Sequence, residues 1–188
     1  MMRQNPFNSL IGVASNKGTV SLYTPNSSDP AIKLLAHSGT VNSFDFSKDG
    51  RYVVTAGSDN QMKVFDIRQN FKELYAYWLP KKPTDIKISQ TGLVASVVGN
   101  DVMFWKNIWH EKQKKPYLKH NSRLNAPINR FNFVPYEDFA GVTSKNNFES
   151  ILVPGSSISD YDTFEHNVSG NHRQERETAV HKLLDKVS

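Results

Sequence analysis

The sequence contains no cysteine, which excludes disulfide bonds and thiolate metal sites. It has no run of 18 consecutive apolar residues and no apolar segment near its N-terminus, so nothing indicates membrane insertion or secretion. The Gly-rich loops that bind nucleotide phosphates are absent, as is the G-x-S-x-G turn of hydrolases. The six histidines show no close ligand spacing, and we expect neither a metal nor another cofactor.

One group of residues has the side-chain types of a catalytic triad, namely Ser156 or Ser157, Asp160 and His166. All of them lie within eleven residues of one polar segment, and no rigid element is predicted beside them. Positioning supplies much of the effect of a triad. We therefore expect no catalysis there, and the sequence does not read as that of an enzyme.

The composition is that of a soluble globular protein with some exposed loops or tails. The 188 residues are 38% hydrophobic and 22% charged, and this length suffices for one buried core or two small ones. The net charge of +5 and a pI near 9.3 permit an acidic partner such as nucleic acid. A charge this mild is equally compatible with a surface that only keeps the protein soluble.

The stretch 37–68 contains three short runs rich in Val, Phe, Tyr and Thr, at 41–46, 52–57 and 62–67. Such residues suit a half-buried strand, and the first run alternates with a period of two. Gly and Asn residues separate the runs and favour tight turns, because both tolerate a positive φ. The stretch therefore predicts an antiparallel meander closed by hairpins.

This unit recurs along the chain. The aromatic residues Tyr23, Phe65 and Trp105 follow one another at steps of 42 and 40 residues. A period of 40–45 residues with four strands per unit is typical of the blades of a WD-repeat propeller. The sequence therefore predicts an all-β fold built from such blades.

Four residues of the second unit correspond to the polar network of a WD repeat. His37 and Asp59 stand where the pattern has its buried His and Asp, and Phe65-Asp66 stands in place of Trp-Asp. Because Phe has no indole N–H, we expect the network to lose its final donor and to depend more on packing.

The boundaries of the predicted blades follow from the apolar runs. The first blade has strands at 10–15, 19–24 and 32–36, with no room for an inner strand before Asn5, and the second ends with an outer strand at 72–78. The third has strands at 84–89, 93–98 and 101–106, followed by a long connection to about residue 120. The fourth has strands at 127–134, 139–143 and 149–153 and no evident outer strand.

These blades number about three and a half, and an incomplete ring would leave two apolar blade faces in water. We therefore expect the chain to be the C-terminal half of a larger propeller. A small four-bladed ring is the structural alternative.

The connection between the third and fourth blades is basic. Residues 106–123 contain six Lys or Arg and one acid, with Trp109 and Tyr117 among them. Basic residues interleaved with aromatics can hold a phosphate backbone and stack on unpaired bases. A solvated loop whose aromatics cap the blade is the alternative interpretation. The candidate contacts with RNA or phosphate are Lys106, Lys112, Lys114, Lys115, Lys119 and Arg123.

The chain changes character after Gly155, so we divide it into propeller blades at 1–155 and a linker with a helix at 156–188. Asn171 is placed to cap a helix over 173–186, with Gln174 reaching back. One side of this helix carries a narrow apolar stripe, which docks either on a partner or on the chain's own propeller. The candidate docking residues are Arg173, Gln174, Glu177, Val180, Leu183 and Leu184.

Several of these segments, in their order along the chain, resemble one WD-repeat family. They include N-P-F-N at 5–8, N-K-G-T-V-S-L-Y at 16–23, H-S-G-T-V at 37–41, F-V-P-Y-E-D at 133–138, S-I-L-V-P-G-S at 150–156 and R-Q-E-R-E at 173–177 with L-L-D-K at 183–186. Together they are similar to the U three protein seven family, whose human member is WD repeat protein forty-six. This family has a dedicated C-terminal domain after its propeller.

The resemblance implies a nucleolar, non-enzymatic scaffold of the small-subunit processome, the assembly with U three snoRNA that processes pre-ribosomal RNA. The implied partners are other processome proteins, pre-rRNA and U three snoRNA, with no membrane and no small-molecule substrate. The alternative is a generic WD-repeat adaptor that binds a peptide on the propeller face.

Overall fold

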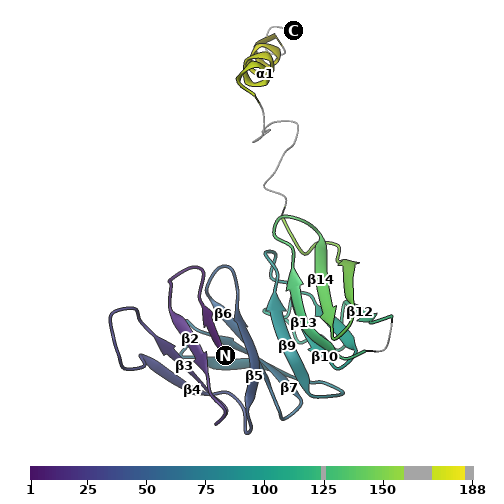
Figure 1. Cartoon of the computed structure of the whole chain (residues 1–188). Helices are drawn as coiled ribbons and strands as arrows, with labels where there is room; N and C mark the ends of the chain where they lie inside the picture. The colour runs from purple at the N-terminus through teal and green to yellow at the C-terminus, as the bar shows by residue number, and fades with distance from the viewer. Residues whose placement is uncertain (124–125, 159–170, 185–188) are drawn as a thin grey trace. The chain divides into compact units, whose positions relative to one another are not determined.

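The computed structural model describes residues 1–123, 126–158 and 171–184 (Figure 1). Contacts between residues divide the chain into two units, 1–158 and 159–188. The division into propeller blades at 1–155 and a linker with a helix at 156–188 stays a prediction. Within the described part of the first unit the strands form four antiparallel sheets, each following the chain in order. The all-β class expected from the sequence is confirmed.

The first sheet has four strands, although the sequence predicted no inner strand for it. The pairs Met2↔Val13, Arg3↔Gly12 and Gln4↔Ile11 join its first two strands. That prediction was wrong because three residues, M-R-Q, are too few to show a hydrophobic period, and backbone pairing defines the strand instead. The strands are β1 (Met2–Gln4), β2 (Ile11–Ala14), β3 (Thr19–Tyr23) and β4 (Ile32–Leu35).

The second sheet matches its predicted boundaries to within one residue. Its second strand is buried along its whole length, as its run of Val, Val, Thr and Ala indicates. Asn60 turns the chain between the next two strands with φ of 59°, a left-handed conformation that Asn tolerates. The strands are β5 (Val41–Phe46), β6 (Tyr52–Gly57), β7 (Gln61–Asp66) and β8 (Lys72–Trp78).

The third sheet contains an outer strand that was not predicted, because its residues were assigned to the long connection. This strand, L-K-H-N, pairs with β11 from Phe104↔Leu118 to Asp101↔Asn121. It is only half-buried at Leu118 and His120 and exposed between them, so its composition is that of a polar loop. The strands are β9 (Pro83–Ile88), β10 (Val94–Val98), β11 (Asp101–Trp105) and β12 (Leu118–Asn121).

The fourth sheet has three strands among the described residues. They are β13 (Ile128–Phe133), β14 (Phe139–Ser144) and β15 (Phe148–Leu152), in that spatial order. Three sheets of four strands and one of three confirm the prediction of about three and a half blades.

Neighbouring sheets meet through their first strands, since β1 lies beside β5, β5 beside β9, and β9 beside β13 (Figure 1). Polar bonds link these strands. The hydroxyl of Ser43 on β5 donates to Asp85 on β9 at 2.9 Å, and the backbone N–H of Ile88 donates to the carboxylate of Asp45 at 3.0 Å. Burial raises the pKa of Asp45, and the Ile88 N–H opposes that rise.

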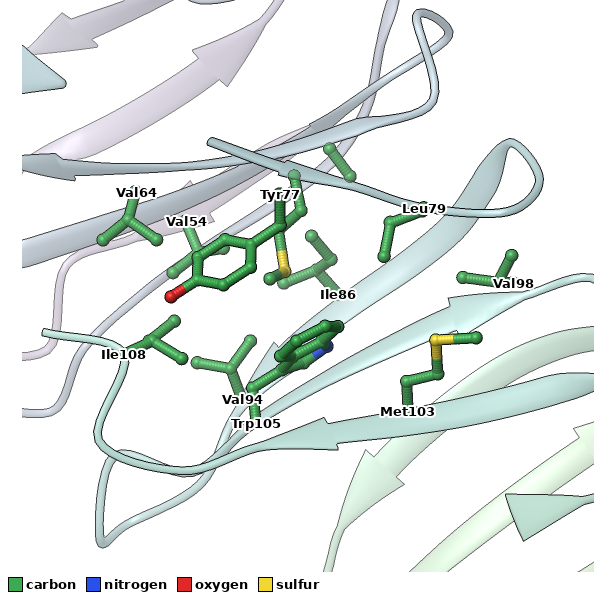
Figure 2. Packing of buried hydrophobic residues seen from close by; sticks show 12 residues of the cluster. Val54, Val64, Tyr77, Leu79, Ile86, Val94, Val98, Met103, Trp105 and Ile108 are labelled. Carbon is green, nitrogen blue, oxygen red and sulfur yellow. The ribbon is translucent and has the colours of Figure 1, made fainter. Parts of the chain in front are cut away.

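Apolar side chains fill the space between the second and third sheets. Tyr77 on β8 and Trp105 on β11 face each other across it, with ring centroids 5.0 Å apart (Figure 2). Val54 and Ile86 are fully buried in the same cluster. Each fully buried side chain of this size contributes roughly 1.5–3 kcal/mol. This apolar cluster therefore contributes strongly to holding the second and third sheets together.

Candidate partner-binding surfaces

His37 is the centre of a polar network at one end of the second sheet. It precedes β5, is only 2% exposed, and directs Nδ1 at the carboxylate of Asp59, 3.0 Å away. Its Nε2 lies 2.8 Å from the hydroxyl of Thr55 on β6. A neutral imidazole donates from Nδ1 and accepts at Nε2, which suits both partners. Burial lowers the pKa of His37, and the Asp59 carboxylate opposes this shift.

Gly57, at the end of β6, leaves space for the side chain of His37. A Cβ at this position would lie 2.4 Å from Cγ of His37 and 2.6 Å from a carboxylate oxygen of Asp59. Any side chain at position 57 would therefore displace the network, which accounts for a glycine here.

Phe65 lies outside this network, in the apolar cluster between the first and second sheets. It is opposite Val53, two residues before Thr55, just as Trp105 in the third sheet is opposite Val94, two residues before Ser96. There the indole of Trp105 donates to the hydroxyl of Ser96 at 3.0 Å.

The two sheets thus each contain part of the repeat's polar network. The second has imidazole, hydroxyl and carboxylate, and the third has indole and hydroxyl. At the position of the third sheet that matches His37, four residues before the first strand, stands the buried Leu79.

Asp66 belongs to a separate set of contacts at the other end of β7 from Asp59. Its carboxylate accepts from Nε of Arg51 at 3.3 Å and from the backbone N–H of Arg68 at 2.9 Å. The grouping of four residues expected from the sequence is therefore corrected. His37 and Asp59 act with Thr55, Asp66 pairs with Arg51, and Phe65 contributes packing because it has no N–H.

A ring stack and two hydrogen bonds hold the basic connection 106–117 against the second sheet. The rings of Trp109 and Tyr52 stack with centroids 4.7 Å apart at an angle of 16°. The hydroxyl of Tyr75 donates to the backbone carbonyl of His110 at 3.0 Å, and the N–H of Gln113 donates to the hydroxyl of Tyr77 at 3.2 Å. One face of Trp109 is thus used within the protein, as the capping interpretation expected of it.

The predicted phosphate contacts divide by what they touch. Lys112, Lys114 and Lys115 are exposed on the connection, whereas Nζ of Lys106 lies 5.5 Å from the ring centroid of Tyr117. Tyr117 itself is 48% exposed. Four lysines thus remain at the surface of one connection.

The other two predicted contacts lie beside carboxylates. Nζ of Lys119 forms an ion pair with Asp101 at 2.9 Å. The backbone N–H of Arg123 donates to the carboxylate of Glu149 at 3.2 Å, and Arg123 itself is an exposed residue. Removal from water, which alone would raise the pKa of Glu149, is outweighed by hydrogen bonds from its neighbours, and its pKa is lowered. The neighbours are His120, Ser122 and Arg123.

A cleft of about 500 Å³ opens where the connection crosses from the third sheet to the second, and we call it the seam cleft. Its lining combines cations, polar groups and the Tyr52–Trp109 pair. No sequence pattern indicates this cleft, because its lining residues come from the β5–β6 turn, the β9–β10 turn and the connection. Apart from the aromatic pair and Gly92, its lining residues are Lys48, Arg51, Asp49, His110, Ser47, Gln90 and Thr91.

The turn at Gly155 is held by Asp138. This carboxylate accepts from the backbone N–H groups of Gly155 and Ser157, both at 3.0 Å, and these bonds lower its pKa. The hydroxyl of Ser156, a buried residue, also points to Asp138 at 3.4 Å. Ser156 therefore has a structural partner, and Asp160 and His166 lie outside the described residues.

The helix α1 (His172–Leu184) begins one residue before its predicted start. The side chain of Gln174 accepts from the backbone N–H of Asn171 at 3.1 Å, as the capping pattern predicted. Arg173 pairs with Glu177 at 3.1 Å, and Val180 is 54% exposed. The side chains of Leu183 and Leu184 lie outside the described part of the structure.

No group of three His, Asp or Glu side chains in 1–123, 126–158 and 171–184 is placed to hold a metal ion. In the same ranges no helix is long and apolar enough to cross a membrane.

The sheets and the His37 network define the class as a partial WD-repeat β-propeller. Residues 28–66 match the WD domain, G-beta repeat. A chain in the crystal structure of the mitotic checkpoint complex superposes with a TM-score of 0.67 over 81% of this chain and 50% of that one. At 15% identity this similarity concerns the fold alone.

Comparison of sequences gives the particular family. Residues 116–188 match the BING4CT (NUC141) domain. WD repeat-containing protein 46 of Caenorhabditis elegans is 36% identical over 100% of this chain, and U3 small nucleolar RNA-associated protein 7 of Saccharomyces cerevisiae is 35% identical over 99% of it. The chain belongs to the family of these two proteins. It spans about a third of the length of each, 32% and 36% respectively.

Proposed function

We propose that this chain is a non-enzymatic scaffold of the U3 snoRNA-containing small-subunit processome and acts in pre-rRNA processing and small-subunit biogenesis in the nucleolus. One observation carries the proposal. The chain is 35% identical, over 99% of its length, to a protein named for its association with U3 small nucleolar RNA.

Two surfaces support a scaffolding role. The basic connection 106–117 presents Lys112, Lys114 and Lys115 to solvent, where they would attract pre-rRNA or snoRNA phosphates. The helix α1 carries exposed Val180 and a capped N-terminus, so it would be formed before it docks on another processome protein. We assign the helix to a partner, because Val180 on it is exposed and a polar stretch of sequence lies between the helix and the last strand.

The test is affinity purification of the tagged chain from its own cells, with sequencing of the RNA that co-purifies. We expect enrichment of U3 snoRNA and of the pre-rRNA leader. A soluble, folded chain that enriches neither RNA would contradict the processome role.

A variant without 159–188 distinguishes the scaffold from a generic peptide-binding adaptor. The scaffold requires this unit, so its deletion should abolish enrichment of processome proteins. The matched control replaces 171–184 with a Gly/Ser segment of equal length and should lose as much as the deletion. An adaptor acting through its propeller face would keep its partners in both variants.

A further inference from the structure

We propose that the seam cleft binds a segment of single-stranded RNA through its phosphate groups. The inference rests on the proposed function, because it supposes that the chain works beside RNA. It goes beyond that function by assigning the contact to a cavity between two sheets rather than to the lysine-rich connection alone.

The charge of the lining favours an anion. Lys48 is exposed at the β5–β6 turn. The side chain of Arg51 is 40% exposed and is paired with Asp66 through Nε at 3.3 Å. The one acid in the lining, Asp49, accepts hydrogen bonds from the hydroxyl of Ser47 and, at 3.1 Å, from the backbone N–H of Arg51. Its Oδ1 is therefore engaged within its own turn, and Lys48 and Arg51 outnumber this one carboxylate in the lining.

The shape of the site suits an extended chain. A second cavity of about 250 Å³ shares Lys48 and Gln90 with the seam cleft, so the two are adjacent. The acid in its lining, Asp45, accepts from the backbone N–H of Ile88. Lys48 stands at their junction. A polymer with a charge on every unit can run through both cavities and place one phosphate beside Lys48, whereas a single small anion would fill only a fraction of this space.

The track continues into the basic connection. His110 lines the cleft and Lys112 follows two residues later, and the bonds from Tyr75 and to Tyr77 hold this part of the chain in place. The cleft and the exposed lysines therefore form one cationic surface on a fixed backbone. Pre-organised cations of this kind lose little side-chain and loop freedom when an anion binds.

An acidic peptide is the competing occupant, and the lining argues against it. Peptide sites offer an apolar groove, a free strand edge or, for acidic motifs, a cluster of arginines. The cleft has one arginine, Arg51, and that side chain pairs with Asp66. Here the largest apolar groups, Tyr52 and Trp109, are stacked on each other, so they do not form a pocket for a peptide side chain. Of the neutral polar groups in the lining, the hydroxyl of Ser47 donates to Asp49 and that of Thr91 donates to the carbonyl of Gly155 at 2.7 Å. The oxygen of the Gln90 amide accepts from the N–H of Tyr136, so its N–H groups are the donors that suit phosphate oxygens.

The decisive variant is Lys48→Glu in the full chain. Lys48 is exposed, so the change should leave the thermal melt unaltered. We expect the dissociation constant for a fluorescein-labelled, mixed-sequence 12-nucleotide RNA to rise about tenfold, and the slope of log K against log salt to fall by about 1. The control is Lys17→Glu, an equal change of charge in the exposed β2–β3 turn, which should bind as the wild type does.

Two further arms make the result specific. A triple variant, Lys112→Ala with Lys114→Ala and Lys115→Ala, measures the contribution of the connection by itself. RNA that contains 4-thiouridine should crosslink to a peptide that includes Tyr52 or Trp109 if the strand enters the cleft. If Lys48→Glu binds RNA like the wild type while the triple variant does not, the inference is wrong and the RNA contact belongs to the connection.

Other outcomes also overturn the inference without deciding the proposed function. A wild-type chain that binds no RNA, or that binds polyglutamate or a phosphopeptide of equal charge more tightly, refutes the RNA cleft. Co-purification of U3 snoRNA from cells decides the processome role independently, since a scaffold can reach that assembly through protein contacts alone.

Discussion

Tyr52 and Trp109 lie 57 positions apart in the sequence, and their rings stack 4.7 Å apart at an angle of 16°. Trp109 also packs over Gly92, where a Cβ would lie 2.9 Å from the indole nitrogen. The contact ties a long polar connection of the third sheet to the second, and in doing so it forms one wall of the seam cleft.

Trp109→Leu should release this connection. The loss of the stacked pair should lower the free energy of unfolding by about 1–2 kcal/mol. Trypsin should then cleave the native protein faster after Lys112 and Lys114, because local opening becomes easier. Trp78→Leu is the control, since that side chain is 74% exposed and should change neither stability nor cleavage. Equal cleavage of the wild type and the Trp109 variant would show that the stack does not anchor the chain.

Phe65→Trp should restore the donor that the second sheet lacks. In the third sheet the equivalent Trp105 bonds Ser96 at 3.0 Å, so an indole at position 65 should reach Thr55. A double-mutant cycle with Thr55→Val should then give a coupling energy of about 1 kcal/mol. The bond from Thr55 to His37 is lost in both backgrounds and cancels. A coupling energy near zero would mean that overpacking keeps the indole away from the hydroxyl.

Stability should fall as the pH drops below 6.5 because of His37. Its pKa in the folded chain lies below the ordinary value of 6.5, chiefly through burial. As the pH falls through 6.5 the unfolded chain takes up a proton first, and this protonation stabilises the unfolded state relative to the folded state. This contribution is fully present above pH 6.5 and is lost between 6.5 and the lowered pKa.

Thermal melts at pH 7.5 and pH 5.5 check this dependence. His37→Gln should be less stable than the wild type at pH 7.5 by about 1–3 kcal/mol, because buried hydrogen bonds are lost. It should also show a smaller decrease between the two pH values. If both proteins lose stability equally, other groups account for the pH dependence.

Asp138→Asn should loosen the turn from which the C-terminal unit begins. An amide presents N–H groups where Gly155 and Ser157 now donate, so one of these bonds is lost. We expect a loss of about 1 kcal/mol, or about 2–4 °C in Tm. Hydrogen exchange should accelerate at the amides of Gly155 and Ser157. Asp29→Asn, in an exposed loop, is the control, and unchanged exchange in the Asp138 variant would refute the anchoring role.

Leu183→Asp combined with Leu184→Asp tests where the helix docks. If α1 serves a partner, the variant should leave large assemblies in a density gradient while its thermal melt stays nearly unchanged. A large fall in Tm would show instead that the helix packs on the chain's own sheets. Arg176→Asp, an exposed position on the same helix, controls for added negative charge.

The local pattern of the sequence was sufficient for most of the strands. In the second sheet every predicted boundary falls within one residue of the observed one, because Val, Phe and Tyr alternate between turns that contain Gly and Asn. The repeat of about 40 residues was likewise enough for the propeller class, since it records one supersecondary unit at a time. The same holds for the capped start of α1, where Asn171 and Gln174 are neighbours in sequence.

The inner strand β1 and the outer strand β12 were missed for a common reason. Both are short and polar, and both exist because a neighbouring strand offers backbone groups to pair with. Such strands are specified by the partner's ladder and not by their own side chains, so no reading of three or four residues could have found them.

By itself the sequence determined the all-β class, the blade repeat, the absence of thiol chemistry and the family to which the chain belongs. Only the tertiary structure decided that Thr55 joins His37 and Asp59 in their network while Asp66 pairs with Arg51, and that two turns and a connection enclose the seam cleft. The physical reason is range. Strands and caps depend on residues a few positions apart, whereas a network or a cleft depends on which distant segments the packing of the sheets brings within a few ångströms.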